Sequence, residues 1–142
     1  MKKVYLASPF FNKKERNSVT LIADFLRKSK GLDVYVPMEH TIPNAWDLPN
    51  NVWGKAVFDE DVKAIDECDT VIVLNWGMYS DSGTAWECGY AFAKGKDVIN
   101  LLMPSKDNDY SLMMVNGCKK TLPWFSFVRE EEWNNFSAIN QK

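Results

Sequence analysis

Residues 70–91 read TVIVLNWGMYSDSGTAWECGYA, an apolar run followed by a polar turn and a second, mostly apolar run. The first run, residues 70–75, is typical of a buried strand of a parallel sheet, and residues 84–94 predict the helix that follows it. Asp81 and Glu87 therefore follow a strand, at the edge where open α/β sheets form their ligand sites. Two carboxylates in such a position are candidates for acid–base or nucleophilic chemistry.

The same alternation of strand and helix extends over the whole chain. Strands are expected at residues 4–7, 33–37, 98–103 and 125–128, and helices at residues 12–28, 52–67, 111–118 and from 130 onward. Residues 38–51 show no periodicity and are expected to form a long loop. The pattern predicts one α/β domain over residues 1–142, a doubly wound parallel sheet of five strands with the flavodoxin-like order 2-1-3-4-5.

In that strand order, the residues that follow the first and third strands face each other across one crevice. Residues 8–11 and 76–81 are expected to line it, and Ser8, Phe11 and Asp81 are the candidate ligand contacts among them.

Three residues outside these two segments are further candidates. Tyr5 points toward the crevice if its neighbours in the strand pack on the opposite face of the sheet. Gly83 lets the backbone approach a ligand closely. Asp61 lies in the helix expected at residues 52–67, so the tilt of that helix decides whether Asp61 reaches the crevice.

Each acidic candidate also has a structural interpretation. Thr84 and Glu87 have the spacing of a helix capping box, and Asp81 begins an Asp-Ser-Gly sequence that suits a turn. Asp61 ends an acidic cluster with Asp59 and Glu60, and such clusters usually form a solvated helix face. The residue pattern alone leaves both interpretations open.

The composition excludes several classes of function. The formal net charge of −2 gives no electrostatic case for binding nucleic-acid polymers or anionic membranes. The three cysteines, Cys68, Cys88 and Cys118, are irregularly spaced, and His40 is the only histidine. A structural metal site is therefore not expected, and reduced thiols in a cytoplasmic protein are favoured. No apolar run is long enough for a signal peptide or a membrane span.

The chain resembles the nucleoside 2-deoxyribosyltransferases, and the resemblance covers most of its length. Four segments carry it in order: residues 4–11, VYLASPFF; residues 53–61, WGKAVFDED; residues 81–91, DSGTAWECGYA; and residues 111–113, SLM. The third segment is the most specific, because it matches the family pattern D-x-G-x-x-x-E-x-G-Y-A.

The resemblance implies a catalytic role for each of three residues and a binding role for a fourth. Glu87 matches the nucleophile that attacks the anomeric carbon of a 2'-deoxynucleoside, and Tyr5 matches the tyrosine that orients this carboxylate. Asp61 matches the acid and base at the nucleobase, for which a raised pKa is expected. Asp81 matches the aspartate that binds a deoxyribose hydroxyl.

The resemblance also implies an assembly and a set of substrates. Ser111, or Asn116 if the local alignment shifts, matches a polar residue that a neighbouring subunit donates to the 5'-hydroxyl of the sugar. A dimer or hexamer with shared active sites is therefore expected. The substrates are 2'-deoxynucleosides and free nucleobases, and the reaction needs no metal or organic cofactor.

Two other functions compete with deoxyribosyl transfer. The first is hydrolysis of a nucleoside or a nucleoside 5'-monophosphate on the same fold, with water resolving the intermediate. Residues 8–11, SPFF, are apolar and lack the glycine and basic residues that would hold a phosphate, which favours an unphosphorylated nucleoside. The second is a non-catalytic nucleotide sensor, which would not require Tyr5, Asp61, Asp81 and Glu87 together.

Overall fold

The structure is a computed structural model that describes residues 1–40, 42, 45–79, 81–106 and 108–129. Its centre is a five-stranded sheet with the order β2-β1-β3-β4-β5, and all neighbouring strands are parallel. The strands are β1 (Lys3–Ala7), β2 (Asp33–Tyr35), β3 (Thr70–Asn75), β4 (Asp97–Leu102) and β5 (Lys120–Pro123). The α/β class and the strand order expected from the sequence are confirmed.

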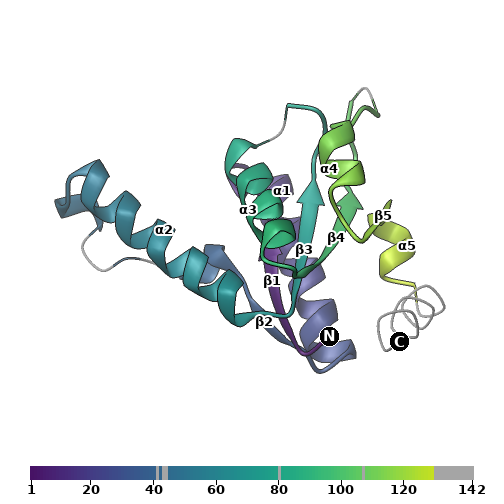
Figure 1. Cartoon of the computed structure of the whole chain (residues 1–142), viewed down its shortest axis with the longest axis horizontal. Coiled ribbons are helices and arrows are strands. Elements are labelled where there is room, and N and C mark those ends of the chain that lie inside the picture. The colour runs from purple at the N-terminus through teal and green to yellow at the C-terminus, as the bar shows by residue number, and fades with distance from the viewer. Residues whose placement is uncertain (41, 43–44, 80, 107, 130–142) are drawn as a thin grey trace.

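Helices cover both faces of the sheet (Figure 1). They are α1 (Lys13–Asp24), which continues as the π-helical turn η1 (Phe25–Ser29), α2 (Asn50–Glu67), α3 (Ser82–Ala93), α4 (Leu112–Asn116) and α5 (Trp124–Phe127). The short 3₁₀ turns η2 (Pro37–Glu39) and η3 (Ala45–Asp47) lie between β2 and α2. Asn12 and Glu15 form a capping box at the start of α1, and Gly31, with φ +64°, ends the segment after η1.

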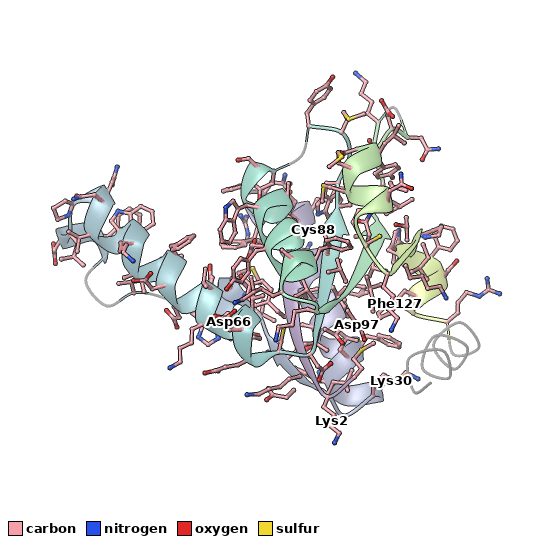
Figure 2. All side chains as sticks on the ribbon, in the orientation of Figure 1. Lys2, Lys30, Asp66, Cys88, Asp97 and Phe127 are labelled. Carbon is pink, nitrogen blue, oxygen red and sulfur yellow. The ribbon has the colours of Figure 1, made fainter. Side chains whose placement is uncertain are left out.

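Alternating side chains divide the core into two clusters, one on each face of the sheet. One cluster joins β1, β3 and β4 to α1 and α5, and it contains Val4, Leu6, Val19, Ile22, Leu26, Ile72, Leu74, Ile99, Leu101 and Phe127. The other joins the same strands to α2 and α3, and it contains Tyr5, Ala7, Ala64, Ile65, Val71, Val73, Cys88, Ala91 and Val98. Figure 2 shows Cys88 on α3 and Phe127 on α5, one from each cluster. Tyr5 therefore points to the face covered by α2 and α3.

The last strand does not lie where the sequence pattern places it. The strand expected at residues 125–128 is instead β5 at Lys120–Pro123, and Trp124–Phe127 form the short helix α5. A short apolar run fits a strand or a buried helical turn equally well. Here Phe127 is fully buried in the core, whereas Leu122 pairs with Leu101 in the sheet. The helix expected from residue 130 onward lies outside the described residues.

The loop and the helices around the site also differ from expectation in their bounds. Residues 38–51 contain most of η2, all of η3 and the first two residues of α2, which begins at Asn50 rather than at residue 52. Helix α2 is long, and its N-terminal half extends beyond the sheet (Figure 1). Its buried residues are Ala64 and Ile65, near the C-terminal end. Among the described residues, no helix is both long enough and apolar enough to cross a bilayer.

Candidate active site

Tyr5 and Glu87 are hydrogen-bonded to each other on the face of the sheet that α2 and α3 cover. Tyr5 is fully buried in β1, and its hydroxyl donates a hydrogen bond to Oε2 of Glu87, 82 positions away in the sequence. Glu87 lies in the second turn of α3, so its side chain points toward the sheet from the helix above. The hydrogen bond fixes one carboxylate oxygen against the strand, which leaves the other for a ligand.

Glu87 lies in the wall of a pocket of about 490 Å³ between α2 and α3. The described residues that line it are Gly54, Val57, Phe58, Asp61, Val62, Ile65, Ser82, Gly83, Trp86 and Glu87. Asp61 and Glu87 are the acidic groups among these residues, and most of the others are apolar. A pocket of this size with a few polar groups on apolar walls is typical of a site for a small organic molecule.

Burial raises the pKa of both carboxyl groups. The pKa of Glu87 rises from 4.5 to about 7, because desolvation and the charges of Asp61 and Asp81 outweigh the hydrogen bond from Tyr5. The pKa of Asp61 rises from 3.8 to about 6, because desolvation and Glu60 outweigh the hydrogen bond from Tyr35 and the influence of His40. Burial and the nearby carboxylates also raise the pKa of the Tyr5 hydroxyl, so this group stays a donor.

Between about pH 6 and pH 7 the two carboxyl groups together hold about one proton. Because the pKa of Glu87 is the higher of the two, this proton lies mainly on Glu87, and the form with Glu87 ionised and Asp61 protonated, which attack by Glu87 needs, is the minor one. The raised pKa expected for Asp61 is therefore present. The pKa of Glu87 is raised as well, since the single hydroxyl of Tyr5 does not replace the water that this carboxylate loses.

The Glu87 pKa predicts how a substitution changes stability. A carboxyl group whose pKa is higher in the native state than in the unfolded chain does not destabilise the protein below about pH 4.5, and destabilises it fully above about pH 7. Glu87→Gln should therefore raise the free energy of unfolding at pH 8 by on the order of 2 kcal/mol, and by much less at pH 4.5. Urea unfolding at both pH values and one protein concentration measures this difference. An equal gain at both would contradict it.

Asp81 caps α3. Its backbone is extended, with φ −152° and ψ 122°, and Oδ2 accepts hydrogen bonds from the backbone N–H of Thr84 at 2.9 Å and from the Thr84 hydroxyl at 2.6 Å. The helix thus begins at Ser82, and Thr84 is its third residue rather than its cap. The Thr84–Glu87 capping box is therefore wrong, and Glu87 makes its hydrogen bond with Tyr5 instead.

Two substitutions separate the cap of Asp81 from a role in binding. Asp81→Ala removes the acceptor of both hydrogen bonds and should lower the free energy of unfolding by about 1 kcal/mol. Asp81→Asn keeps an acceptor and should keep most of that stability. If Asp81 also binds a sugar hydroxyl, Asp81→Asn should raise KM while its thermal stability stays near that of the native protein. Full activity of Asp81→Asn would show that Asp81 caps the helix and does not bind the sugar.

The other predicted contacts lie outside this pocket. The Ser8 hydroxyl donates to the carbonyl of Pro9 at 2.8 Å, and Phe11 is exposed in the loop after β1. Ser111 precedes α4, and Asn116 donates its side-chain amide to the carbonyl of Leu112 at 2.8 Å. None of these four is among the described residues that line the pocket, so their binding roles stay predictions. Gly83, in contrast, is one of the lining residues.

The sequence pattern missed the aromatic walls of the pocket. Phe58 on α2 and Trp86 on α3 meet edge to face with ring centroids 5.2 Å apart. Trp86 also stacks on Tyr90, whose hydroxyl donates to Asp66 of α2 at 2.7 Å. Phe58 precedes Asp61 by three positions, the spacing of one helix face, and this was the signal that could have identified it.

The described residues contain no group of three or more His, Cys, Asp or Glu side chains arranged to hold a metal ion. The polar groups that define the chemistry of the site are its two carboxylates. One is hydrogen-bonded at the sheet, the other lies on the facing helix, and apolar walls lie beside them. This arrangement suits the cleavage of a glycosidic bond, for which pairs of carboxylates are the usual solution.

Comparisons with solved structures agree on the fold. A 2-deoxyribosyltransferase from Bacillus psychrosaccharolyticus superposes with a TM-score of 0.79 at 30% sequence identity, covering 90% of each chain. A CMP N-glycosidase from Clostridium botulinum gives a TM-score of 0.62 at 23% identity, covering 96% of this chain and 99% of its own. A 2-desoxiribosyltransferase from Leishmania mexicana gives 0.64 at 21% identity, covering 92% and 99%. No curated protein matches the sequence.

The fold and the relatives that share it place the chain among α/β enzymes of glycosyl transfer or glycosidic cleavage. The sequence model described as Nucleoside 2-deoxyribosyltransferase matches residues 4–122. The chain belongs to the nucleoside 2-deoxyribosyltransferase family.

Proposed function

We propose that the protein transfers 2-deoxyribose from one nucleobase to another through a covalent deoxyribosyl–Glu87 intermediate. The observation that supports this proposal is that Glu87, hydrogen-bonded to Tyr5, lies in the same pocket as Asp61. Glu87 is held by the Tyr5 hydroxyl, and it shares the pocket between α2 and α3 with Asp61. A nucleophile and a proton donor beside the same bound molecule are what exchange of a leaving base requires.

The reaction consists of two displacements. In the first, Oε1 of Glu87 forms a bond to the anomeric carbon, the N-glycosidic bond breaks, and Asp61 gives its proton to the leaving base. In the second, Asp61 takes a proton from the incoming base, whose nitrogen attacks the same carbon and releases Glu87. Both steps pass through a positively charged, oxocarbenium-like sugar, which the carboxylate stabilises.

The aromatic wall suits a nucleobase. Phe58 and Trp86 line the pocket, and each residue is 47% exposed. Base rings stack favourably on aromatic side chains and gain little specificity from doing so. A site of this kind accepts several bases in turn, which an exchange reaction requires.

Hydrolysis of a nucleoside or its 5'-monophosphate is the competing function, and the CMP N-glycosidase has the same fold at 23% identity. The loop after β1 argues against a phosphate group. The loop exposes Phe10 and Phe11, which are 39% and 76% exposed. The Ser8 hydroxyl donates its hydrogen bond to the carbonyl oxygen of Pro9 and so does not offer it to a phosphate. An unphosphorylated deoxynucleoside is therefore the proposed substrate.

One experiment separates these functions. The protein is incubated with 2'-deoxyinosine, with and without free adenine, and the products are separated by chromatography. Appearance of 2'-deoxyadenosine only with adenine supports the transferase. Equal release of hypoxanthine and free deoxyribose with and without adenine would assign a hydrolase. Parallel incubation with cytidine 5'-monophosphate tests the phosphorylated substrate.

We also propose that a second copy of the chain covers the free half of α2, as expected if subunits share active sites. Val52 and Trp53 are 45% and 37% exposed on this helix. Exposed apolar side chains on a helix that extends beyond the sheet are typical of a subunit interface. Light scattering at micromolar concentration measures the assembly, and a monomer would contradict it.

A further inference from the structure

Tyr35 lies beside the catalytic tyrosine. It is the last residue of β2, and the register of the two strands places Tyr35 directly opposite Tyr5. Their rings stack with centroids 5.4 Å apart and planes inclined by 11°. Neighbouring strands hold paired side chains at such distances. The ring of Tyr35 therefore supports the ring whose hydroxyl holds Glu87.

The hydroxyl of Tyr35 reaches the second carboxylate. It donates a hydrogen bond of 3.4 Å to Oδ1 of Asp61. The terminal torsion of an aspartate side chain is broad, so a free carboxyl group takes many orientations. A donor on Oδ1 restricts that rotation and leaves Oδ2 for the pocket that Asp61 lines. Oδ2 is then the oxygen that carries the exchanged proton.

Tyr35 is itself held in place. Its ring also stacks with His40, with centroids 4.1 Å apart and planes inclined by 12°. Nδ1 of His40 lies 3.5 Å from Oε1 of Glu60, the residue that precedes Asp61 on α2. The segment from Tyr35 at the end of β2 to His40 after η2 therefore contacts the middle of α2 twice, through Tyr35 and Asp61 and through His40 and Glu60.

We propose that Tyr35 is a positioning residue: its hydroxyl orients the carboxyl group of Asp61 toward the nucleobase, and its ring holds Tyr5 against Glu87. The inference rests on the proposed function, because it assigns Asp61 to the base and Glu87 to the sugar. One side chain thus sets the placement of both reacting groups, although it is absent from the described residues that line the pocket.

The groups around Asp61 determine whether removal of the Tyr35 hydroxyl raises or lowers the pKa of Asp61. The Tyr35 hydroxyl stabilises the ionised carboxylate and lowers the pKa, and His40 acts in the same direction. Burial and Glu60 raise it, and across the pocket Asp61 faces Glu87 and the hydroxyl of Tyr5. Removing only the Tyr35 hydroxyl should therefore raise the pKa of Asp61 above about 6.

The test compares Tyr35→Phe with Tyr90→Phe. Each removes a hydroxyl that donates to an aspartate of α2, Asp61 in one case and Asp66 in the other.

Two measurements are made on each variant. The pKa of Asp61 is followed by NMR of protein labelled with ¹³C at aspartate carboxyl groups, with Asp61→Asn identifying the signal. Release of base is measured for 2'-deoxyguanosine and for 7-methyl-2'-deoxyguanosine, whose cationic base leaves without a proton.

For Tyr35→Phe we expect an upward shift of the Asp61 pKa and a loss of about tenfold in kcat for 2'-deoxyguanosine, the effect of one hydrogen bond to a charged group. The 7-methyl substrate should change less than about twofold, since Phe keeps the stack on Tyr5. Tyr90→Phe should change neither readout. Tyr35→Leu, which also removes the stack, should slow both substrates.

Two results would overturn the inference. One is an unchanged Asp61 pKa in Tyr35→Phe, and the other is an equal loss for both substrates in that variant. The NMR readout needs no turnover. If the native protein cleaves neither substrate, the proposed function fails while the contact between Tyr35 and Asp61 is still tested.

Discussion

Glu87→Gln is expected to slow deoxyribosyl transfer by on the order of 10⁴-fold, which corresponds to about 5.5 kcal/mol of transition-state stabilisation. The amide keeps the size of the side chain and can still accept the hydrogen bond from Tyr5. It cannot form a stable bond to the anomeric carbon or balance the positive charge on the sugar. The loss should therefore appear in kcat, with little change in substrate affinity.

The covalent intermediate gives this prediction a second measurement. Native protein mixed with 2'-deoxyinosine in the absence of acceptor and quenched in acid should gain the mass of one deoxyribosyl group, and peptide mapping should locate it on Glu87. Glu87→Gln should gain none. Glu67→Gln is a matched control, because Glu67 is exposed at the end of α2. Near-normal transfer by Glu87→Gln, or an adduct on another residue, would exclude Glu87 as the nucleophile.

Asp61→Asn is expected to slow base exchange by about 10²- to 10⁴-fold, the usual effect of losing a general acid. The asparagine cannot transfer a proton, so the effect should depend on the leaving base. 7-Methyl-2'-deoxyguanosine, whose base departs without protonation, should lose much less activity than 2'-deoxyguanosine. Steady-state rates for the two substrates in the native protein and the variant measure this difference.

Asp59→Asn is the matched control for this substitution. Asp59 lies two positions earlier on the same helix, but it is exposed and pairs with Lys55 at 2.6 Å. Its replacement should leave both rates within about twofold of the native values. Equal losses for the two substrates in Asp61→Asn would show that Asp61 supports the pocket structurally and does not protonate the base.

The strands were predictable from the sequence where periodicity and length agree. Residues 71–74 are all apolar, and together with Thr70 and Asn75 they form β3, which is buried on both faces. The error at the last strand came from a run, FSFV, that is too short to distinguish strand from helix. Its conformation depends on Phe127 filling the core beside α1, a contact between segments far apart in the chain.

The candidate site was predictable only in part. The spacing of Asp81 and Glu87 and the apolar neighbours of Tyr5 are local features, and they indicated a site near the end of β3. The sequence did not determine which group the Glu87 carboxylate contacts, because the same glutamate also fits a helix capping box. The cap turned out to be Asp81, since its side chain reaches the N–H of Thr84. Because Asp81 caps the helix, Glu87 is not needed in a capping box, and its side chain accepts the hydrogen bond from Tyr5 instead.

The sequence by itself determined the parallel sheet, the order of its strands and the acidic residues available for chemistry. The elements follow from periodicity and turn residues, which are properties of short segments, and the strand order follows from the right-handed crossovers that connect parallel strands. Only the tertiary structure decided that Asp61 faces Glu87 across the pocket between α2 and α3, and that Tyr35 contacts both Asp61 and Tyr5. Those contacts depend on helix packing and strand register, which join segments separated by many residues and leave no periodic signal.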